Sequence, residues 1–250
     1  MRYSDVLHTI DRSDIEEDLV GWGTGDWHGG SRFHDEVTFE KHWAWAVDAK
    51  AVLFHVGDAL EMTTITSKVA SKGALLDQVW TTEQQREWAI MRLSHMDDGV
   101  FLAGNHEQRI DNTTGLNFAK SLAENTKVKP LDVPGFVRVL VGDQQYNVLM
   151  HHGEGPAANP ATLANRLQSI YEGADLVLAG HIHSADSNPV EMRTVDGPRH
   201  VQRLRVGHYL DFPPYVMRRP TTTLSPVGSW RLRFRHDIHR IETEWMYKDY

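Results

Sequence analysis

The chain has 250 residues, of which 40% are hydrophobic, so it can bury a substantial core, and we expect one domain over residues 1–250. Its formal net charge of -8 excludes a protein that coats long nucleic acid through a general basic surface. The absence of cysteine excludes disulfides and thiol nucleophiles, so any metal ligands must be imidazole, carboxylate, amide or water groups.

The N-terminal residues argue against export. Residues 1–19 carry several acidic side chains where a secretory signal needs a basic start followed by an apolar run. No later stretch approaches the length of about 20 apolar residues that spans a membrane. We therefore expect a cytoplasmic protein without a membrane partner.

Five apolar runs of strand length recur along the chain. In the first half, helix-like stretches separate these runs, and this order is typical of a layered α/β fold. Two pairs of glycine with aspartate, Gly142-Asp143 and Asp196-Gly197, lie between later β-like runs and favour hairpin turns there. The second half is therefore expected to be more antiparallel. The five apolar runs are Leu19–Gly23, Ala51–Val56, Val100–Ala103, Tyr146–Met150 and Leu176–Ala179.

Two helices are predicted between the early runs. The spacing of apolar residues indicates a helix from Phe39 to Ala49, with Trp43 in the core. A second helix is expected from about Glu83 to His95, and Thr81 with Gln84 can form a capping box at its start.

Each apolar run is followed within three residues by Asp, Asn or His. Residues after separate strands converge at the carboxyl edge of a sheet, which is where ligands bind in α/β folds. A single Gly-Asp or Gly-Asn pair is just as often a turn, but five such segments together favour a site. The segments are Gly25-Asp26-Trp27-His28, Gly57-Asp58-Ala59-Leu60-Glu61, Gly104-Asn105-His106-Glu107, His151-His152-Gly153 and Gly180-His181-Ile182-His183.

These segments resemble the signature of the calcineurin-like metallophosphoesterase superfamily over residues 20–184. The wider pattern, including a segment from Tyr215 to Pro226, is similar to phosphoesterases of phage and bacterial genomes. The resemblance implies a four-layer α/β/β/α sandwich, in which two mixed sheets are flanked by helices. It also implies a metal-dependent phosphoric ester hydrolase, located in the host cytoplasm if a phage encodes it.

The resemblance further implies a pair of divalent metal ions, with Asp58 bridging them. We place His151 among the ligands because it directly follows its strand. His152 is the alternative, since it precedes Gly153 and one residue decides which face a side chain takes. Mn²⁺ is favoured by the resemblance, and the ligand types also suit Fe, Zn or Ni. The implied set is Asp26, His28 and His183 for one ion, and Asn105, His181 and the histidine of the 151–152 pair for the other.

Three residues near Asn105 have expected roles in catalysis, in which hydroxide activated by the metals attacks phosphorus. The resemblance makes His106 the group that steadies the phosphoryl oxygen or protonates the leaving oxygen. Glu107 is expected to orient His106, or else to be a solvated charge. Arg109 is expected to bind a phosphate oxygen, or else to cap a helix. Glu61 stands where the family often has Asn or Asp, and its role is left open.

We expect a phosphodiesterase acting on nucleotides, such as cyclic nucleotides or short nucleic-acid ends, because His106 supplies the leaving-group chemistry that a diester needs. The same metal pair supports phosphomonoesterase activity, since the fold does not decide between them. A nuclease acting on long nucleic acid is less expected, given the charge. The alternative from another class is an inactive, metal-dependent binding module. The sequence does not indicate an oligomeric state.

Residues 193–240 reverse the overall charge balance, with ten Arg and three acidic residues. This pattern indicates either an anionic partner or the solvent face of strands, and alternation of Arg favours the strand face. Arg218 and Arg219, in a proline-rich stretch, are the better candidates to approach a substrate or subunit. His55 lies within an apolar run and is expected to be a hydrogen-bonded core histidine.

Overall fold

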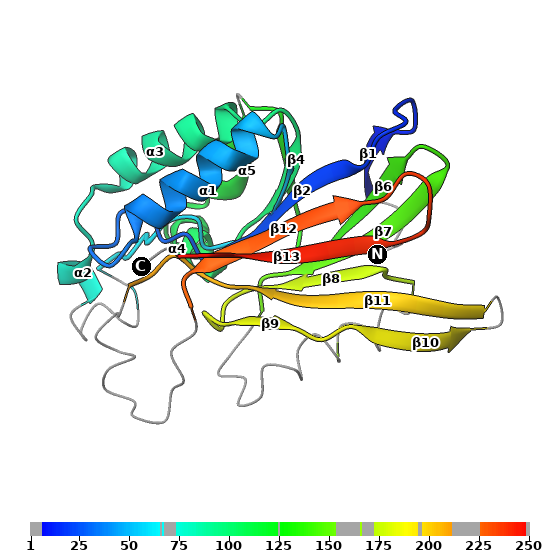
Figure 1. Cartoon of the computed structure of the whole chain (residues 1–250). Helices are drawn as coiled ribbons and strands as arrows, with labels where there is room; N and C mark the ends of the chain where they lie inside the picture. The colour runs from blue at the N-terminus through cyan, green and yellow to red at the C-terminus, as the bar shows by residue number, and fades with distance from the viewer. Residues whose placement is uncertain are drawn as a thin grey trace.

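The computed structural model describes residues 7–65, 67, 74–124, 126–153, 166, 173–194, 197–211 and 226–248. Two mixed β-sheets stack face to face, and helices lie along the outer side of one of them (Figure 1). This arrangement confirms the expected α/β fold with two sheets and flanking helices. The described helices lie on the side of the six-stranded sheet, so the fourth layer of the expected order is not seen within the described ranges.

The six-stranded sheet has a parallel centre that reads almost entirely apolar. Strands β2, β3, β4 and β5 run parallel, while β12 pairs antiparallel with β2 and with β13. Parallel strands covered on both faces need apolar side chains throughout, which explains the uninterrupted runs in the sequence. The order is β13 (Ile241–Tyr247), β12 (Gly228–Phe234), β2 (Leu19–Thr24), β3 (Val52–His55), β4 (Gly99–Leu102) and β5 (Val128–Leu131).

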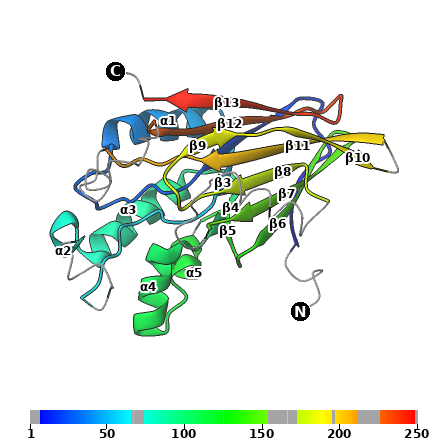
Figure 2. The same ribbon diagram turned by 90° about the horizontal axis from the view of Figure 1, so that it is seen from below.

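The seven-stranded sheet contains both predicted hairpins (Figure 2). Strands β6 and β7 join at Gly142, and β10 pairs antiparallel with β11; Asp196 itself lies outside the described residues. Strand β1 pairs parallel with β6, a pairing not predicted from the sequence. The order is β1 (Leu7–Arg12), β6 (Gly135–Val141), β7 (Gln144–His151), β8 (Leu176–Ala179), β11 (Gly197–Val206) and β10 (Val190–Thr194), with β9 (Ala185–Ser187) also on β11.

The two predicted helices are present, each with its N-terminus capped by a side chain. Asp35 accepts a hydrogen bond from the Thr38 N–H at the start of α1, while Thr81 and Gln84 form the predicted capping box of α3. Trp43 packs against the core, as expected. Within the described ranges, every helix is too short or too polar to cross a membrane. The helices are α1 (Glu36–Asp48), α2 (Ala74–Asp77), α3 (Thr82–Ser94), α4 (Asn105–Thr114) and α5 (Phe118–Ala123).

Two layers of apolar side chains hold the strands in place. Along β3, Val52 and Phe54 belong to the layer between the sheets, whereas Leu53 belongs to the layer beneath the helices. This alternation follows from the two-residue period of a strand. Because β3 is packed on both faces, the position of the chain at its carboxyl end is closely defined.

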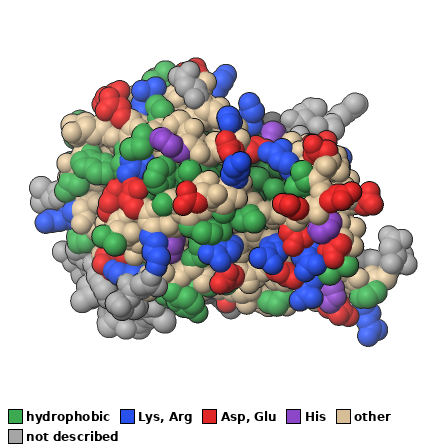
Figure 3. All heavy atoms as spheres, turned by 45° about the horizontal axis from the view of Figure 1, so that its top comes forward, with side chains coloured by type: hydrophobic (Ala, Val, Ile, Leu, Met, Phe, Trp, Pro, Cys, Tyr) green, Lys and Arg blue, Asp and Glu red, His purple; other side chains and the backbone are tan. Residues whose placement is uncertain are grey.

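The Arg-rich segment forms ion pairs with neighbouring acidic side chains. Arg199 contacts Asp175 at 2.7 Å, and Arg231 contacts Glu244 at 2.9 Å across β12 and β13. On the face shown in Figure 3, basic and acidic side chains are interspersed rather than gathered into one basic patch. These pairs support the strand-face interpretation for the Arg residues that the structure describes. Arg218 and Arg219 lie outside the described residues.

Candidate functional site

The five polar segments identified in the sequence converge at one edge of the sandwich. Three follow β2, β3 and β4 of the six-stranded sheet, and two follow β7 and β8 of the other sheet. The two carboxylates that the sequence singled out, Asp26 and Asp58, are buried, while Asn105 and His181 are half-buried. The site therefore has a buried acidic base and a rim that reaches solvent.

The segments after β2 and β3 continue the parallel pairing of their strands. The Asp26 N–H donates to the Gly57 carbonyl at 2.9 Å, and the His28 N–H donates to the Asp58 carbonyl at 3.1 Å. A further bond joins the Gly29 N–H to the Ala59 carbonyl at 2.8 Å. These backbone bonds bring two segments that are 30 residues apart into fixed register, which places Asp26 and His28 beside Asp58.

Several site residues adopt the left-handed backbone conformation that L-residues disfavour. This conformation costs about 1–2 kcal/mol per residue, so the surrounding structure must stabilise it. It also breaks the alternation of an extended chain and lets nearby side chains turn toward a common centre. Such strained residues cluster at functional sites in proteins, so their concentration here makes this edge the candidate site. The φ angles are 48° at Asp26, 52° at His28, 55° at Asp58, 73° at His181 and 48° at His183.

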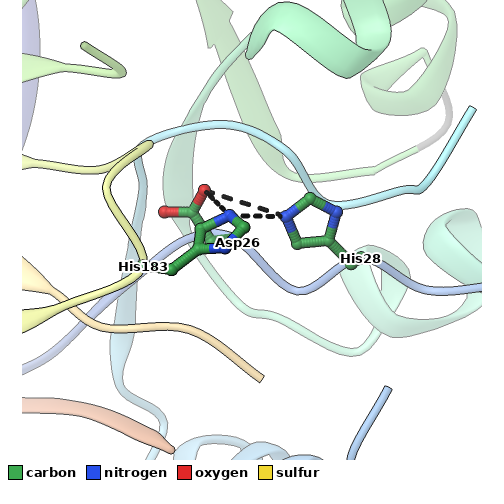
Figure 4. Close-up of side chains that lie close together, drawn as sticks. All are labelled: Asp26, His28 and His183. Atoms are coloured by element: carbon green, nitrogen blue, oxygen red, sulfur yellow. Dashed lines mark hydrogen bonds and ion pairs between the residues drawn. The ribbon is translucent and has the colours of Figure 1, made fainter. Parts of the chain in front are cut away.

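Asp26, His28 and His183 form the first group of ligand-type atoms (Figure 4). The Asp26 Oδ1 atom lies 3.4 Å from His183 Nε2, and the two imidazole Nε2 atoms lie 3.0 Å apart. Asp26 is fully buried, and its Oδ1 has no hydrogen-bond partner in the described part of the chain. A buried carboxylate oxygen facing two imidazole nitrogens, without a hydrogen bond, fits a bound cation.

Asp58, His152 and His181 form the second group. His152 Nε2 lies 3.2 Å from Asp58 Oδ2 and 3.0 Å from Asn105 Oδ1, while its Nδ1 donates to the Val56 carbonyl at 3.0 Å. Although burial opposes protonation, the Asp58 carboxylate raises the pKa of His152 to about 9. This concentration of negative charge around Nε2 is the environment that a divalent cation requires.

The structure corrects the choice between the two adjacent histidines. His151 is the last residue of β7, and its Nδ1 accepts a hydrogen bond from the Gly153 N–H at 2.8 Å. His152 instead lies buried in the second group. His152 continues the alternation of Val148 and Met150, which face the layer between the sheets, whereas His151 falls on the outer face with Leu149.

Glu107 has a different role from the one expected. Its carboxylate does not orient His106 but accepts three backbone hydrogen bonds, from Gly104 at 2.8 Å, Asp58 at 3.0 Å and Leu60 at 3.1 Å. The side chain is fully buried, and burial together with the Asp58 charge raises its pKa to about 7. Glu107 thus holds the segments after β3 and β4 against each other.

The close approach of those two segments requires glycine at position 104. A Cβ atom there would lie 2.1 Å from Asp58 Oδ1 and 2.3 Å from the Asp58 backbone nitrogen. With glycine in place, α4 begins directly at Asn105, and the His106 N–H donates to Asp58 Oδ1 at 2.8 Å. The N-terminus of α4 therefore faces a carboxylate, an arrangement that the helix dipole stabilises.

His106 and Arg109 lie together on α4 at the rim of the site. The His106 Nδ1 donates to the Glu61 carbonyl at 2.5 Å, so its Nε2 accepts from Arg109 Nη2 at 2.9 Å. Burial lowers the pKa of His106 to about 4, despite the opposing effects of Asp58 and Glu61. The ring is therefore neutral near pH 7, with its Nε2 atom 3.7 Å from Asp58 Oδ2.

Comparison with known proteins identifies similar folds. No family model matches the chain, and a search of curated proteins finds no match. Vps29 from Cryptosporidium parvum is similar at 14% identity with a TM-score of 0.48, covering 93% of this chain and 100% of that one. A predicted phosphoesterase from Streptococcus pneumoniae has 14% identity and a TM-score of 0.39, covering 92% and 98%. Vps29 from Entamoeba histolytica, complexed with Zn²⁺, has 10% identity and a TM-score of 0.44, covering 91% and 99%.

Identities this low compare folds only, so what the site does is argued from its geometry. Two groups of side chains that could hold divalent metal ions lie side by side in the described part of the chain.

Two further residues at the site had no role assigned from the sequence. Glu61 places its Oε2 atom 3.2 Å from His28 Nδ1. His208, which follows Gly207 after β11, is buried with its ring centroid 5.4 Å from that of His183. A partial signal for His208 was present, because a glycine and a histidine follow a β-like run here, but Arg203 and Arg205 make that run less apolar than those before the other segments.

His55 confirms the expectation of a hydrogen-bonded core histidine. Its Nδ1 accepts the Gly57 N–H at 3.1 Å, and its ring stacks on Phe101 with centroids 4.7 Å apart. The residue is fully buried, and its ring also meets Trp27 edge-on. His55 therefore supports the turn that leads into Asp58 rather than joining the ligand groups.

Proposed function

We propose that the chain is a dinuclear-metal-dependent phosphodiesterase that acts on nucleotides. The observation that supports this most is the pair of adjacent ligand groups, one of which contains the buried Asp26 Oδ1 atom, to which no described residue donates a hydrogen bond. Each group combines side chains from both sheets, so the ions would sit where the sheets meet.

The residues at this edge fit a pair of divalent ions. Asp26, His28 and His183 would hold one ion, and His152, His181 and Asn105 the other, with Asp58 shared. When bound, such ions lower the pKa of a water ligand and neutralise phosphate charge. Imidazole, carboxylate and amide ligation suits Mn, Fe, Zn or Ni, and we favour Mn²⁺.

His106 and Arg109 would act on the substrate from the rim. Arg109 is half-buried, and its guanidinium, now beside the His106 ring, can bind a phosphate oxygen. Once Arg109 has turned to the phosphate, His106 Nε2 would take up a proton from solvent while Nδ1 keeps its own on the Glu61 carbonyl, and the ring would pass the Nε2 proton to the leaving oxygen. A nucleotide ester releases an alkoxide, which departs poorly unless protonated, so this pair supports cleavage of nucleotide esters, among which we propose diesters as the substrates.

The test is hydrolysis by metal-stripped protein reloaded with Mn²⁺. We expect faster turnover of bis-p-nitrophenyl phosphate than of p-nitrophenyl phosphate, followed by cleavage of cyclic nucleotides or dinucleotides. The Asp58→Asn variant should lose both bound Mn²⁺ and turnover. Preference for the monoester would identify a phosphomonoesterase instead, and inactivity on every substrate with both ions bound would identify a binding module.

A further inference from the structure

Glu61 lies between the first ligand group and the rim residues. Its side chain is 12% exposed, with Oε2 3.2 Å from His28 Nδ1 and Oε1 within 3.2 Å of the Thr63 hydroxyl. Its backbone carbonyl accepts hydrogen bonds from His106 and Arg109 at 2.5 and 3.1 Å. One residue therefore contacts a ligand-type imidazole through its carboxylate and the rim through its backbone.

The contact with His28 determines where that ring carries its proton. His28 Nε2 faces Asp26 and lies 3.0 Å from His183 Nε2, so it must present a lone pair if the first group is to bind an ion. A neutral imidazole then has its only proton on Nδ1. The Glu61 carboxylate is the acceptor for that proton, and this hydrogen bond fixes both the tautomer and the rotation of the ring.

A cation bound between His28, Glu61 and His106 would be the other explanation for this cluster, whose ligand atoms also lie close together. It would need a lone pair on His28 Nδ1 while Nε2 serves the first group, which a neutral imidazole cannot provide. His106 Nδ1 is also engaged with the Glu61 carbonyl. The geometry is therefore that of a hydrogen bond rather than of a third ion.

The backbone on both sides of Glu61 is fixed. Its N–H donates to the Gly29 carbonyl at 3.1 Å. The neighbouring Leu60 and Met62 side chains are fully buried, and the Met62 N–H donates to Gln85 Oε1 at 3.0 Å. Because the backbone cannot shift toward His28, the length of the side chain decides whether the carboxylate reaches the ring.

We propose that Glu61 is a positioning residue that fixes His28 for metal binding in the first group. This inference rests on the proposed function only in requiring that the first group binds an ion. It predicts that Mn²⁺ affinity depends more on a hydrogen-bond acceptor at the distance of the Glu61 carboxylate than on the negative charge of that carboxylate.

Three substitutions separate reach from charge. Glu61→Gln keeps the length and a carbonyl acceptor but loses the charge, whereas Glu61→Asp keeps the charge but is one methylene too short. Glu61→Ala removes both, and Glu83→Gln, at an exposed position of α3, is the surface control. The measurement is titration of metal-stripped full-length protein with Mn²⁺ by calorimetry, with metal content checked by mass spectrometry.

We expect the weaker binding step to lose about 10- to 100-fold in affinity in Glu61→Asp and Glu61→Ala, and clearly less in Glu61→Gln. In a His28→Ala background, Glu61→Ala should have no further effect, because the two residues act through one contact. Gln is isosteric with Glu, and Asp shortens the side chain by one methylene without removing its polar end, so these two variants answer the question if Glu61→Ala does not fold.

Two results would overturn the inference. If Glu61→Asp binds Mn²⁺ like the wild type while Glu61→Gln does not, the residue acts through its charge alone. If all variants bind like the wild type, the contact does not position His28. Binding is measured without substrate, so it is independent of turnover. If the Glu61 variants lose Mn²⁺ affinity and the wild-type protein cleaves no phosphate ester, this inference stands and the proposed activity is rejected.

Discussion

His106 shows how much of the proposed chemistry depends on a single ring. Its Nδ1 is committed to the Glu61 carbonyl, so Nε2, which Arg109 contacts in the free protein, is the nitrogen that would serve a substrate. Burial keeps the free ring neutral near pH 7, so Nε2 must take up a proton from solvent before it can give one to a leaving oxygen. A group placed at the leaving oxygen typically contributes about 10²- to 10⁴-fold to the rate. The contribution should grow as the leaving group becomes harder to expel.

We therefore expect His106→Ala to reduce turnover of a nucleotide diester by about 10²-fold or more, with a smaller loss on p-nitrophenyl esters. Metal content should stay close to that of the wild type, because His106 lies outside the two ligand groups of the proposed site. Steady-state rates on both substrates, with metal analysis, check this. His95→Ala, at the end of α3, is the matched control, and an equal loss on both substrates would argue against proton donation.

Single residues also show where sequence reasoning reached its limit. The residue types and their spacing predicted that Asp26, His28 and Asp58 would lie together, because strand ends converge at a sheet edge. The structure favours His152 over His151, because the site opens on the face of β7 between the sheets, which His152 shares with Met150, and the sequence alone did not show which face that would be. The partners of Glu61 could not be inferred, since contacts between segments need the register of β2 against β3.

At the scale of elements, Glu107 links the start of α4 to the segment after β3. Replacing it with Ala would leave three buried backbone N–H groups without their acceptor, each costing about 1–3 kcal/mol. We expect Glu107→Ala to lower the free energy of unfolding by about 3 kcal/mol or more and to weaken metal binding at Asp58. Urea denaturation and Mn²⁺ titration measure these effects. Glu124→Ala, beside the end of α5, should change neither, and unaltered metal binding in Glu107→Ala would show that the segments keep their positions without it.

The prediction of elements was most successful where both faces of a strand are buried. The runs that became β2, β3, β4, β7 and β8 were all predicted, because strands covered on both sides are apolar throughout. Strand β1 was not, since Leu7–Arg12 mixes polar and apolar residues and is defined by its pairing with β6. Helix α4 was also missed as an element, because its first residues appeared only as polar site residues.

At the scale of the whole molecule, His42 connects α1 to the last strand and makes stability depend on pH. Its ring is buried, with Nδ1 2.9 Å from the Tyr209 hydroxyl and Nε2 3.3 Å from the Tyr247 carbonyl. Burial lowers its pKa to about 4, whereas an exposed histidine titrates near 6.5. Between these values the unfolded chain binds the extra proton, so stability is complete above about pH 6.5 and is lost as the pH falls toward 4.

Glutamine does not titrate, so we expect His42→Gln to remove up to about 3 kcal/mol of the loss in the free energy of unfolding that acid causes in the wild type. The measurement is the urea midpoint of wild type and variant at pH 7.5, 6 and 5, using metal-stripped protein. His200→Gln, at an exposed position, is the control and should follow the wild type. Parallel pH profiles for wild type and His42→Gln would show that His42 does not cause the loss.

Each ligand group draws on both sheets, so the thickness of the apolar layer between the sheets sets the spacing of the proposed ions. Val56 lies at this junction: its Cγ2 atom would be 2.5 Å from a Cβ at Gly25, after β2, and 2.7 Å from a Cβ at Gly180, after β8. The buried side chains of this layer set the distance between the two sheets. Adding or removing one methyl group there would change the distance between the proposed ions that must hold a phosphate. Differences in metal preference and substrate size among related chains can thus arise from buried aliphatic residues that touch neither metal nor substrate.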